Sequence, residues 1–212
     1  MHVRRSLRPE ILDELDATDA RALRSRRDLR LVNHFMRGEA WIARQITRMD
    51  GIERVVELGA GEGHLAAELK RRMPQAEVVA LDLAPRPQHL DERVIWWQGN
   101  VLDYECYDSG TMVVANLFLH HLTESELGRL GAIIRGSYGL LAAEPHRGQV
   151  GMVLGRCLFP FVNDVTRHDM LVSIRAGFRP RELAGFLHTN GEWQWSEQRG
   201  WFGGIRTKAL AA

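Results

Sequence analysis

The alternation of apolar and polar positions divides the chain into two parts. In residues 1–50 apolar residues recur three and four positions apart, and this spacing predicts helices. After residue 50 short apolar runs alternate with segments of helical spacing; the runs are RVVELGA, EVVALDLA, RVIWWQGNVL, TMVVANLFL and GLLAAEP. Because these runs are apolar almost throughout and helices separate them, the pattern favours a parallel sheet covered on both faces.

The C-terminal third departs from this alternation. Residues 149–178 form an apolar, aromatic and proline-containing segment of looser periodicity, and FRPRELAGFL at its end predicts a helix. The segments EWQWSEQRGWF and GGIRTKAL predict a β-hairpin that turns at Gly203-Gly204. The sequence thus divides into N-terminal helices in residues 1–50 and an α/β domain in residues 51–212.

Composition and charge narrow the class of protein. A chain of 212 residues suffices for one buried core, and a net charge of +1 gives no overall field that would attract nucleic acid. Two cysteines, Cys106 and Cys157, cannot form a disulfide framework, and neither HExxH nor paired CxxC motifs indicate a metal site. No apolar run reaches the roughly twenty residues that span a bilayer, and no signal peptide is recognisable. We therefore expect a cytoplasmic protein with reduced thiols, no metal and no membrane insertion.

A glycine-rich loop follows the first expected strand. The sequence VVELGAGEGHL, residues 55–65, has glycine at every second position from 59 to 63. A dinucleotide-binding loop needs a small residue at the last position of G-x-G-x-x-G/A, where this chain has His64. Glu62 places a carboxylate at the helix N-terminus, where a pyrophosphate would bind. The loop therefore favours a ligand without phosphate and disfavours NAD(P).

The spacing E-x-G-x-G-x-G from Glu57 to Gly63 resembles motif I of class I S-adenosylmethionine-dependent methyltransferases. The resemblance implies an α/β, Rossmann-like fold with a seven-stranded, mostly parallel sheet, an antiparallel C-terminal hairpin and the N-terminal helices as a cap. It also implies S-adenosylmethionine as the cofactor. The cofactor-binding residues that it implies are Glu57, Gly59, Ala60, Gly61, Asp82, Leu83, Asn100, Val101, Asn116 and Leu117.

Some of these positions have specific expected roles. Asp82 ends the second strand about twenty residues after the loop, where an acidic side chain can bind two ribose hydroxyls. Asn100 stands where the family often has an aspartate for the adenine amine. Its side-chain oxygen can accept the same hydrogen bond, and Asp103 is the alternative. The backbone of Val101 would contact the adenine ring.

The segment after the fourth strand indicates the class of methyl acceptor. Asn116 is followed by Leu117-Phe118-Leu119 and not by the Pro-Pro-aromatic sequence of enzymes that methylate nucleic-acid bases, so we expect no nucleic-acid partner. The segment NLFLHHL instead resembles small-molecule methyltransferases, including groups that modify quinones and polyketides. We expect residues 149–178 to form a lid over the acceptor, with Phe161 among its contacts; packing on the core is the alternative.

The rate of methyl transfer from a sulfonium depends mainly on how the acceptor is positioned relative to the methyl group. Holding the acceptor in line can contribute roughly 7–11 kcal/mol, more than a general base provides. If a base assists, we expect His120 after the fourth strand or His168 beside Asp169, with Arg175 as an anchor for an anionic acceptor. A structural role is the alternative for each histidine.

The resemblance thus predicts a methyltransferase that acts at oxygen or carbon of a small aromatic or polyketide- or quinone-like molecule. The alternatives are a protein that binds S-adenosylmethionine without catalysis and an NAD(P)-dependent oxidoreductase. Arg30, Asn33 and Arg37 of the N-terminal helices are candidates to bind the carboxylate of the cofactor.

Overall fold

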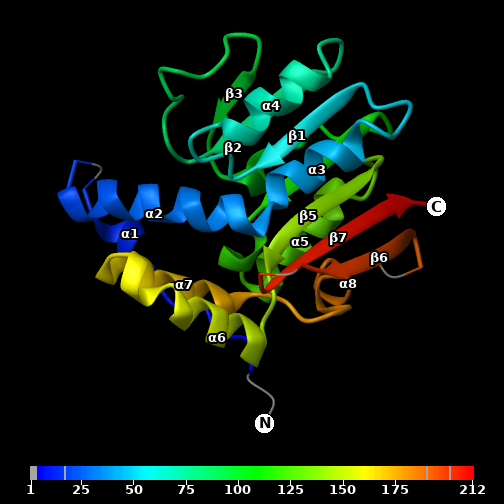
Figure 1. Ribbon diagram of the computed structural model, residues 1–212. Helices are drawn as coiled ribbons and strands as arrows, with labels where there is room; N and C mark the ends of the chain where they lie inside the picture. Colours follow the sequence, from blue (N-terminus) through cyan, green and yellow to red (C-terminus); the bar gives the residue numbers. More distant parts are fainter. Residues whose placement is uncertain (1–3, 17, 190, 201) are drawn as a thin grey trace.

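A seven-stranded sheet forms the centre of the protein (Figure 1). The computed structural model describes residues 4–16, 18–189, 191–200 and 202–212. The strand order is β3-β2-β1-β4-β5-β7-β6; pairs from β3 to β5 are parallel, and β7 is antiparallel to both of its neighbours. The strands are β1 (Arg54–Leu58), β2 (Glu77–Asp82), β3 (Ile95–Gln98), β4 (Thr111–Asn116), β5 (Gly139–Pro145), β6 (Trp193–Arg199) and β7 (Gly204–Ala211). The predicted fold class, including the C-terminal hairpin, is confirmed.

Helices cover both faces of the sheet because successive strand side chains point to opposite faces. In β1, Val56 and Leu58 belong to the core beneath α5 and α8, whereas Val55 belongs to the core beneath α3 and α4. By the same alternation Glu57 is on the side of α3 and α4. The helices are α1 (Ile11–Glu14), α2 (Ala20–Met36), α3 (Gly38–Ile46), α4 (His64–Arg72), α5 (Glu124–Ile134), α6 (Gln149–Cys157), α7 (Asp164–Ala176) and α8 (Glu182–Phe186).

The break between the first two long helices lies one residue earlier than the glycine at position 38 suggests. The chain turns at Arg37, whose φ is 54°, and Gly38 is the first residue of α3. A Cβ atom at Gly38 would lie 2.3 Å from Oδ1 of Asn116. Glycine at this position therefore lets α3 approach the end of β4.

Residues 149–178 are more regular than their loose periodicity predicts. They contain α6, a 3₁₀ turn at Phe159–Phe161 and α7. The N-terminal segment is attached to α7, because Asp169 accepts hydrogen bonds from the backbone N–H groups of Ile11 and Leu12 at 2.7 and 3.0 Å. The N-terminal segment and α7 thus form one layer.

This layer lies beyond the carboxyl ends of the parallel strands (Figure 1). The strand order reverses between β1 and β4, and in open α/β sheets ligands bind at such a switch point. In the part of the chain that the structure describes, no helix has the length and apolar character needed to cross a membrane.

Candidate active site

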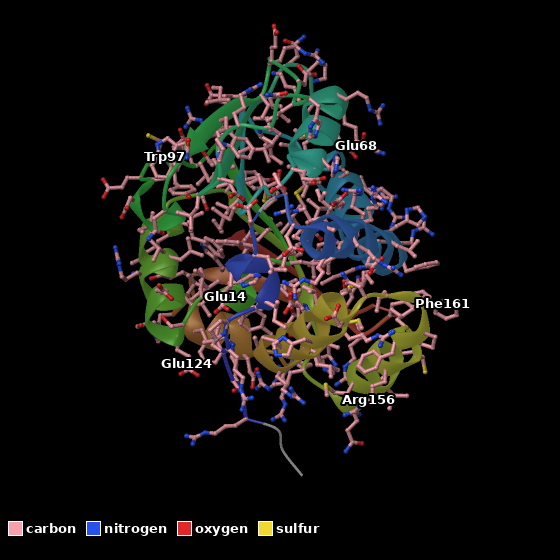
Figure 2. The ribbon with its side chains drawn as sticks, turned by 90° about the vertical axis from the view of Figure 1, so that its left-hand side faces the viewer. Glu14, Glu68, Trp97, Glu124, Arg156 and Phe161 are labelled. Carbon is pink, nitrogen blue, oxygen red and sulfur yellow. The ribbon has the colours of Figure 1, made fainter. Side chains whose placement is uncertain are left out.

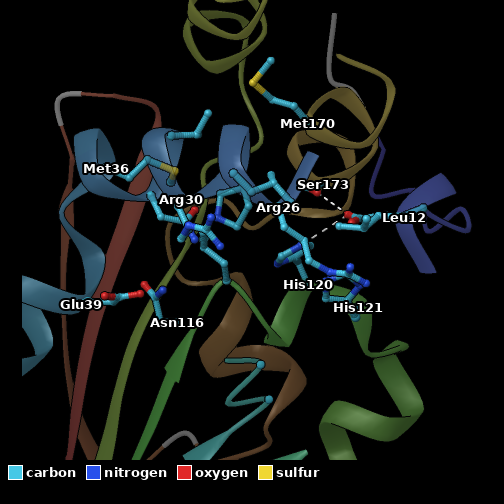
Figure 3. Close-up of a pocket in the computed structure, with 18 of the residues that line it drawn as sticks. Leu12, Arg26, Arg30, Met36, Glu39, Asn116, His120, His121, Met170 and Ser173 are labelled. Atoms are coloured by element: carbon cyan, nitrogen blue, oxygen red, sulfur yellow. Dashed lines mark hydrogen bonds and ion pairs between the residues drawn. The ribbon is translucent and has the colours of Figure 1, made fainter. Parts of the chain in front are cut away.

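A cavity of about 870 Å³ lies between the carboxyl ends of β1, β2 and β4 and the helices α2, α6 and α7 (Figure 3). The strand ends and their loops contribute Glu57, Gly59, Ala60, Gly61, Asp82, Asn116 and Leu117. The helices contribute mainly apolar side chains: Leu29, Val32, Phe35, Met36, Leu154, Leu158, Met170 and Ile174. The cavity therefore has a polar end over the sheet and an apolar end beneath the helices.

The glycine loop has a backbone that only glycine adopts without strain. Gly59, Gly61 and Gly63 have φ values of 65°, 55° and 75°. A Cβ atom at Gly59 would lie 2.0 Å from the ring of Phe118. The N–H of Gly61 donates to Oδ2 of Asp82 at 2.7 Å. The loop therefore holds the Asp82 carboxylate at the cavity wall.

Glu57 is a buried carboxyl group that lacks a full set of partners. Its side chain lines the cavity, the residue is 3% exposed, and Oε2 has no hydrogen-bond partner among the described residues. Burial, and then the carboxylate of Glu39, raise the pKa of Glu57 well above its usual value. Burial also raises the pKa of Glu39 on α3. Since a negative charge on Glu39 disfavours the ionised form of Glu57, a cation bound between the two carboxyl groups would be stabilised.

In another part of the cavity, Glu144 of β5 fixes the orientation of the His120 ring. Glu144, in β5, is buried and accepts hydrogen bonds from the backbone N–H groups of Phe118, Leu119 and His120 at 3.0, 2.8 and 3.3 Å. Its Oε2 is also 2.8 Å from Nδ1 of His120. A carboxylate can only accept, so the ring donates from Nδ1, and in the neutral imidazole the lone pair is on Nε2.

Nε2 of His120 faces Glu10 of the N-terminal segment, with 3.9 Å between Nε2 and Oε1. Glu10 is buried, which raises its pKa, and it contacts the hydroxyl of Ser173 on α7. Arg5 anchors the same segment, because its guanidinium donates to the carbonyl oxygens of His120 and Leu122 at 3.2 and 2.7 Å. The N-terminal segment is thus part of the cavity wall.

His121 lies against His120, with 4.2 Å between the ring centroids. Its side chain opens onto the cavity, yet the protein around it, and then His120, lower its pKa to about 3. The ring is therefore neutral at ordinary pH. Ligand atoms of Glu10, His120 and His121 all lie within 4.8 Å of one another, so these residues have the separation of metal ligands.

Eight of the predicted site residues line this cavity: Glu57, Gly59, Ala60, Gly61, Asp82, Asn116, Leu117 and His120. Leu83, Asn100 and Val101 lie outside the lining. Leu83 is 75% exposed, and the side-chain oxygen of Asn100 accepts from the N–H of Leu102 at 3.0 Å at the start of a 3₁₀ turn. These residues follow the ends of β2 and β3, beside Asp82.

The expected acceptor contacts on α7 are corrected by the structure. His168 and Arg175 are seven residues apart and share one helix face, whereas Met170, Ser173 and Ile174 occupy the opposite face and line the cavity. His168 does contact Asp169, at 3.0 Å, but outside the cavity.

Phe161 also lies outside the cavity. It is 71% exposed and points away from the body of the protein (Figure 2). The 3₁₀ turn that follows α6 places it on the surface.

Helix α2 contacts the glycine loop through one of its arginines. Arg30 and Asn33 line the cavity, and Nη1 of Arg30 is 3.1 Å from Oε2 of Glu62. Arg37 forms the turn between α2 and α3 and is not in the lining.

Sequence reasoning missed Glu10, Glu39, Glu144 and Ser173. A charged residue inside the apolar run GLLAAEP is a signal for Glu144, because a buried carboxylate requires partners. Nothing in the local pattern around Glu10 indicates that it approaches His120, which is more than a hundred residues away in the chain.

No family model matches the chain. Two curated relatives share parts of it. An uncharacterized methyltransferase of Mycobacterium tuberculosis is 34% identical over 92 residues, which are 40% of this chain and 46% of the relative. The malonyl-[acyl-carrier protein] O-methyltransferase of Xylella fastidiosa is 41% identical over 69 residues, which are 32% of this chain and 23% of the relative. The matches thus span less than half the length of either relative.

Similarity to solved structures covers nearly the whole chain. The plantazolicin methyltransferase BamL, solved with a triazolic desmethylPZN analog and SAH, superposes with a TM-score of 0.70 at 10% identity. The match covers 94% of this chain and 92% of BamL. The chain therefore has the fold of class I S-adenosylmethionine-dependent methyltransferases, as its sequence predicts.

Proposed function

We propose that this protein transfers the methyl group of S-adenosylmethionine to a small, largely apolar acceptor of aromatic, polyketide-like or quinone-like structure, at oxygen or carbon. The observation that carries the proposal is the continuity of the cavity, in which Asp82 and Glu57 share one space with His120 and the apolar helices. A cofactor on the strand ends would direct its methyl group toward the apolar half. The lid of residues 149–178 and the cap of residues 1–50 belong to this proposal as the two parts that enclose the acceptor.

The chemistry of the polar end suits each part of the cofactor. The ammonium group would lie near Glu57 and Glu39, where a positive charge stabilises two carboxyl groups. The ribose hydroxyls would donate to Asp82, whose oxygens each retain a lone pair beside their present bonds. The adenine would lie over the exposed side chain of Leu83 and near the backbone of Val101, with Asn100 beside them.

The apolar end suits an acceptor that must be held in line with the S–CH₃ bond. The acceptor oxygen or carbon forms a bond to the methyl carbon, the S–C bond breaks, and its electron pair stays on sulfur as S-adenosylhomocysteine forms. The acceptor's proton would pass to Nε2 of His120, whose tautomer Glu144 fixes. Position supplies the larger share of the rate, about 7–11 kcal/mol.

Two measurements test the proposal. Calorimetry with S-adenosylhomocysteine and with NAD should show binding of the first and not the second. Labelled S-adenosylmethionine and a panel of phenols and hydroxyquinones should then give a methylated product. His120→Ala should lower turnover about 10²–10⁴-fold, and His168→Ala, a histidine outside the cavity, should not.

Each outcome decides between classes of function. Binding of NAD in place of S-adenosylhomocysteine would contradict the assignment of the cofactor. Binding of S-adenosylhomocysteine without methylation of any acceptor would leave a cofactor-binding protein. Equal turnover of the two histidine variants would reject His120 as a general base. Catalysis would then rest on the positioning of the acceptor against the methyl group.

We also propose that the acceptor is free of nucleic acid and that the protein works in the cytoplasm. The net charge of +1 and the absence of Pro-Pro-aromatic after Asn116 support the first statement. Cys106 and Cys157 are exposed free thiols, which a reducing compartment would preserve.

A further inference from the structure

We propose that Glu10, His120 and His121 bind a divalent transition-metal ion at the acceptor end of the cavity. Their ligand atoms lie within 4.8 Å of one another, and all three residues line the cavity. What the ion does there rests on the proposed function. Whether it binds does not, because binding is measured by itself.

The arrangement around His120 is the first argument. A histidine that ligates a metal almost always donates its other ring N–H to a carboxylate, a carbonyl or water, which fixes the tautomer and the ring orientation. Here Nδ1 of His120 lies 2.8 Å from Oε2 of Glu144, and three backbone N–H groups hold Glu144 in place. Nε2 is therefore directed toward Glu10 before any ion binds.

The second argument is the separation between Nε2 of His120 and Oε1 of Glu10. At 3.9 Å it is too long for a hydrogen bond. In the neutral ring Nε2 presents a lone pair to Oε1, which also accepts from the hydroxyl of Ser173, so a cation between the two atoms would be stabilised. Zinc–nitrogen and zinc–oxygen bonds are about 2.0–2.2 Å long, so an ion fits after a small closure of this gap. The carboxyl of Asp13 lines the same end of the cavity and adds to its preference for positive charge.

His121 supplies a third ligand and leaves the site open. Its ring is next to that of His120 and is accessible from the cavity, so the remaining coordination positions face the acceptor. Three protein ligands and an open position are the arrangement of catalytic zinc sites, and two imidazoles with a carboxylate suit zinc, iron and cobalt.

Such an ion would lower the pKa of an acceptor hydroxyl bound to it. Ligation uses the same lone pair of His120 that would otherwise accept the proton. The ion therefore takes the place of the base when it is bound.

The test uses the full chain without a histidine tag, freed of metal by dialysis against a chelator. Calorimetry with Zn²⁺ and visible absorption with Co²⁺ should show one ion per chain. Glu10→Gln and His121→Ala should each weaken binding more than 10-fold. Glu144→Gln, which alters the hydrogen-bond partner of His120 and removes no ligand, should weaken it about 10–100-fold. His168→Ala is the matched control, since this histidine also lies beside a carboxylate but outside the cavity, and it should bind as the unaltered protein does.

Absence of one-to-one binding, or equal affinity in the unaltered protein and both ligand variants, would overturn the metal site. Circular dichroism and thermal unfolding of each variant establish that it is folded. If Glu10→Gln unfolds the protein, His121→Ala still tests the site, because the side chain of His121 is open to the cavity. Turnover in chelator that equals turnover with the ion bound would overturn the role of the ion in methyl transfer and leave the proposed function. Ion binding that is lost in the variants, in a protein that methylates no acceptor, would leave the site and overturn the proposed function.

Discussion

At the residue scale, the side chain of Glu144 determines which ring nitrogen of His120 faces the cavity. Glu144→Gln keeps the shape of the side chain but can present an NH₂ group to Nδ1. The ring would then carry its proton on Nε2, and a protonated Nε2 has no lone pair with which to accept a proton or bind a metal. We expect turnover to fall about 10²-fold or more while the affinity for S-adenosylhomocysteine is unchanged.

Steady-state rates with calorimetry on the same sample check this prediction. Glu126→Gln is the matched control, because Glu126 also accepts a hydrogen bond from a backbone N–H, that of Thr123, in the capping box of α5. It should lower the free energy of unfolding slightly and leave turnover intact. Equal turnover in both variants would show that the orientation of His120 does not matter.

Gly38 gives a prediction about packing. Because a Cβ atom there would lie 2.3 Å from Oδ1 of Asn116, Gly38→Ala must displace either α3 or the end of β4. Overpacking of this kind costs about 1–3 kcal/mol. Denaturant unfolding should show this loss. Gly136→Ala, where an added Cβ meets nothing within 4 Å, should show none.

Glu57 gives a prediction about pH. Its pKa is raised in the ligand-free protein, so this carboxyl keeps its proton to a higher pH than an ordinary glutamate does, and an ammonium group bound nearby would favour the ionised form. Binding of S-adenosylhomocysteine should therefore release protons, and its affinity should increase as the pH rises through the raised pKa. Calorimetry in buffers of different ionisation enthalpy measures the release. Glu57→Gln should reduce it; a release unchanged by this substitution would place the titrating group elsewhere.

At the scale of elements, the sequence predicted the strands well and the helical layer poorly. Buried parallel strands leave apolar runs such as EVVALDLA that few other structures produce. The two helices in residues 149–178 were not predicted, because Gly151, Gly155 and Pro160 interrupt the spacing of apolar residues in this segment. His168 and Arg175 were expected at the acceptor but lie on the face of α7 that is turned away from the cavity. The rotation of this helix depends on contacts with α1 and α2, which are distant in sequence.

The attachment of the N-terminal segment to α7 can be tested through Asp169. This buried carboxylate accepts from the backbone of Ile11 and Leu12 and from His168. Asp169→Ala leaves those N–H groups without their acceptor, at a cost of about 1–3 kcal/mol for each one that stays buried. The backbone amide hydrogens of residues 5–15 should then exchange faster. If their protection is unchanged, other contacts hold the segment.

At the scale of the whole molecule, the cavity is closed by parts of the chain that are far apart in sequence. The cofactor end is built from strand ends and the loops between them. The acceptor end needs β5 for Glu144, α7 for Ser173 and the N-terminal segment for Glu10. Motif spacing predicted residues that line the first end, because these residues lie in loops that are local in sequence. It could not identify the second end, because the contacts of Glu10 exist only once the chain has folded.

Removal of residues 1–10 separates the two ends of the cavity. The shortened chain loses Glu10 and Arg5 but keeps β1, β2 and the glycine loop. We therefore expect its affinity for S-adenosylhomocysteine to stay within about 3-fold of that of the full chain, a difference of less than about 0.7 kcal/mol in binding free energy. Methyl transfer should be lost, because the wall opposite His120 is missing. A synthetic peptide of residues 4–10, added at high concentration, should restore part of the rate, and the same peptide with glutamine at position 10 should restore less. Full turnover of the shortened chain would show that the acceptor is held by the helices alone, whereas loss of cofactor binding as well would mean that the N-terminal segment organises the strand ends.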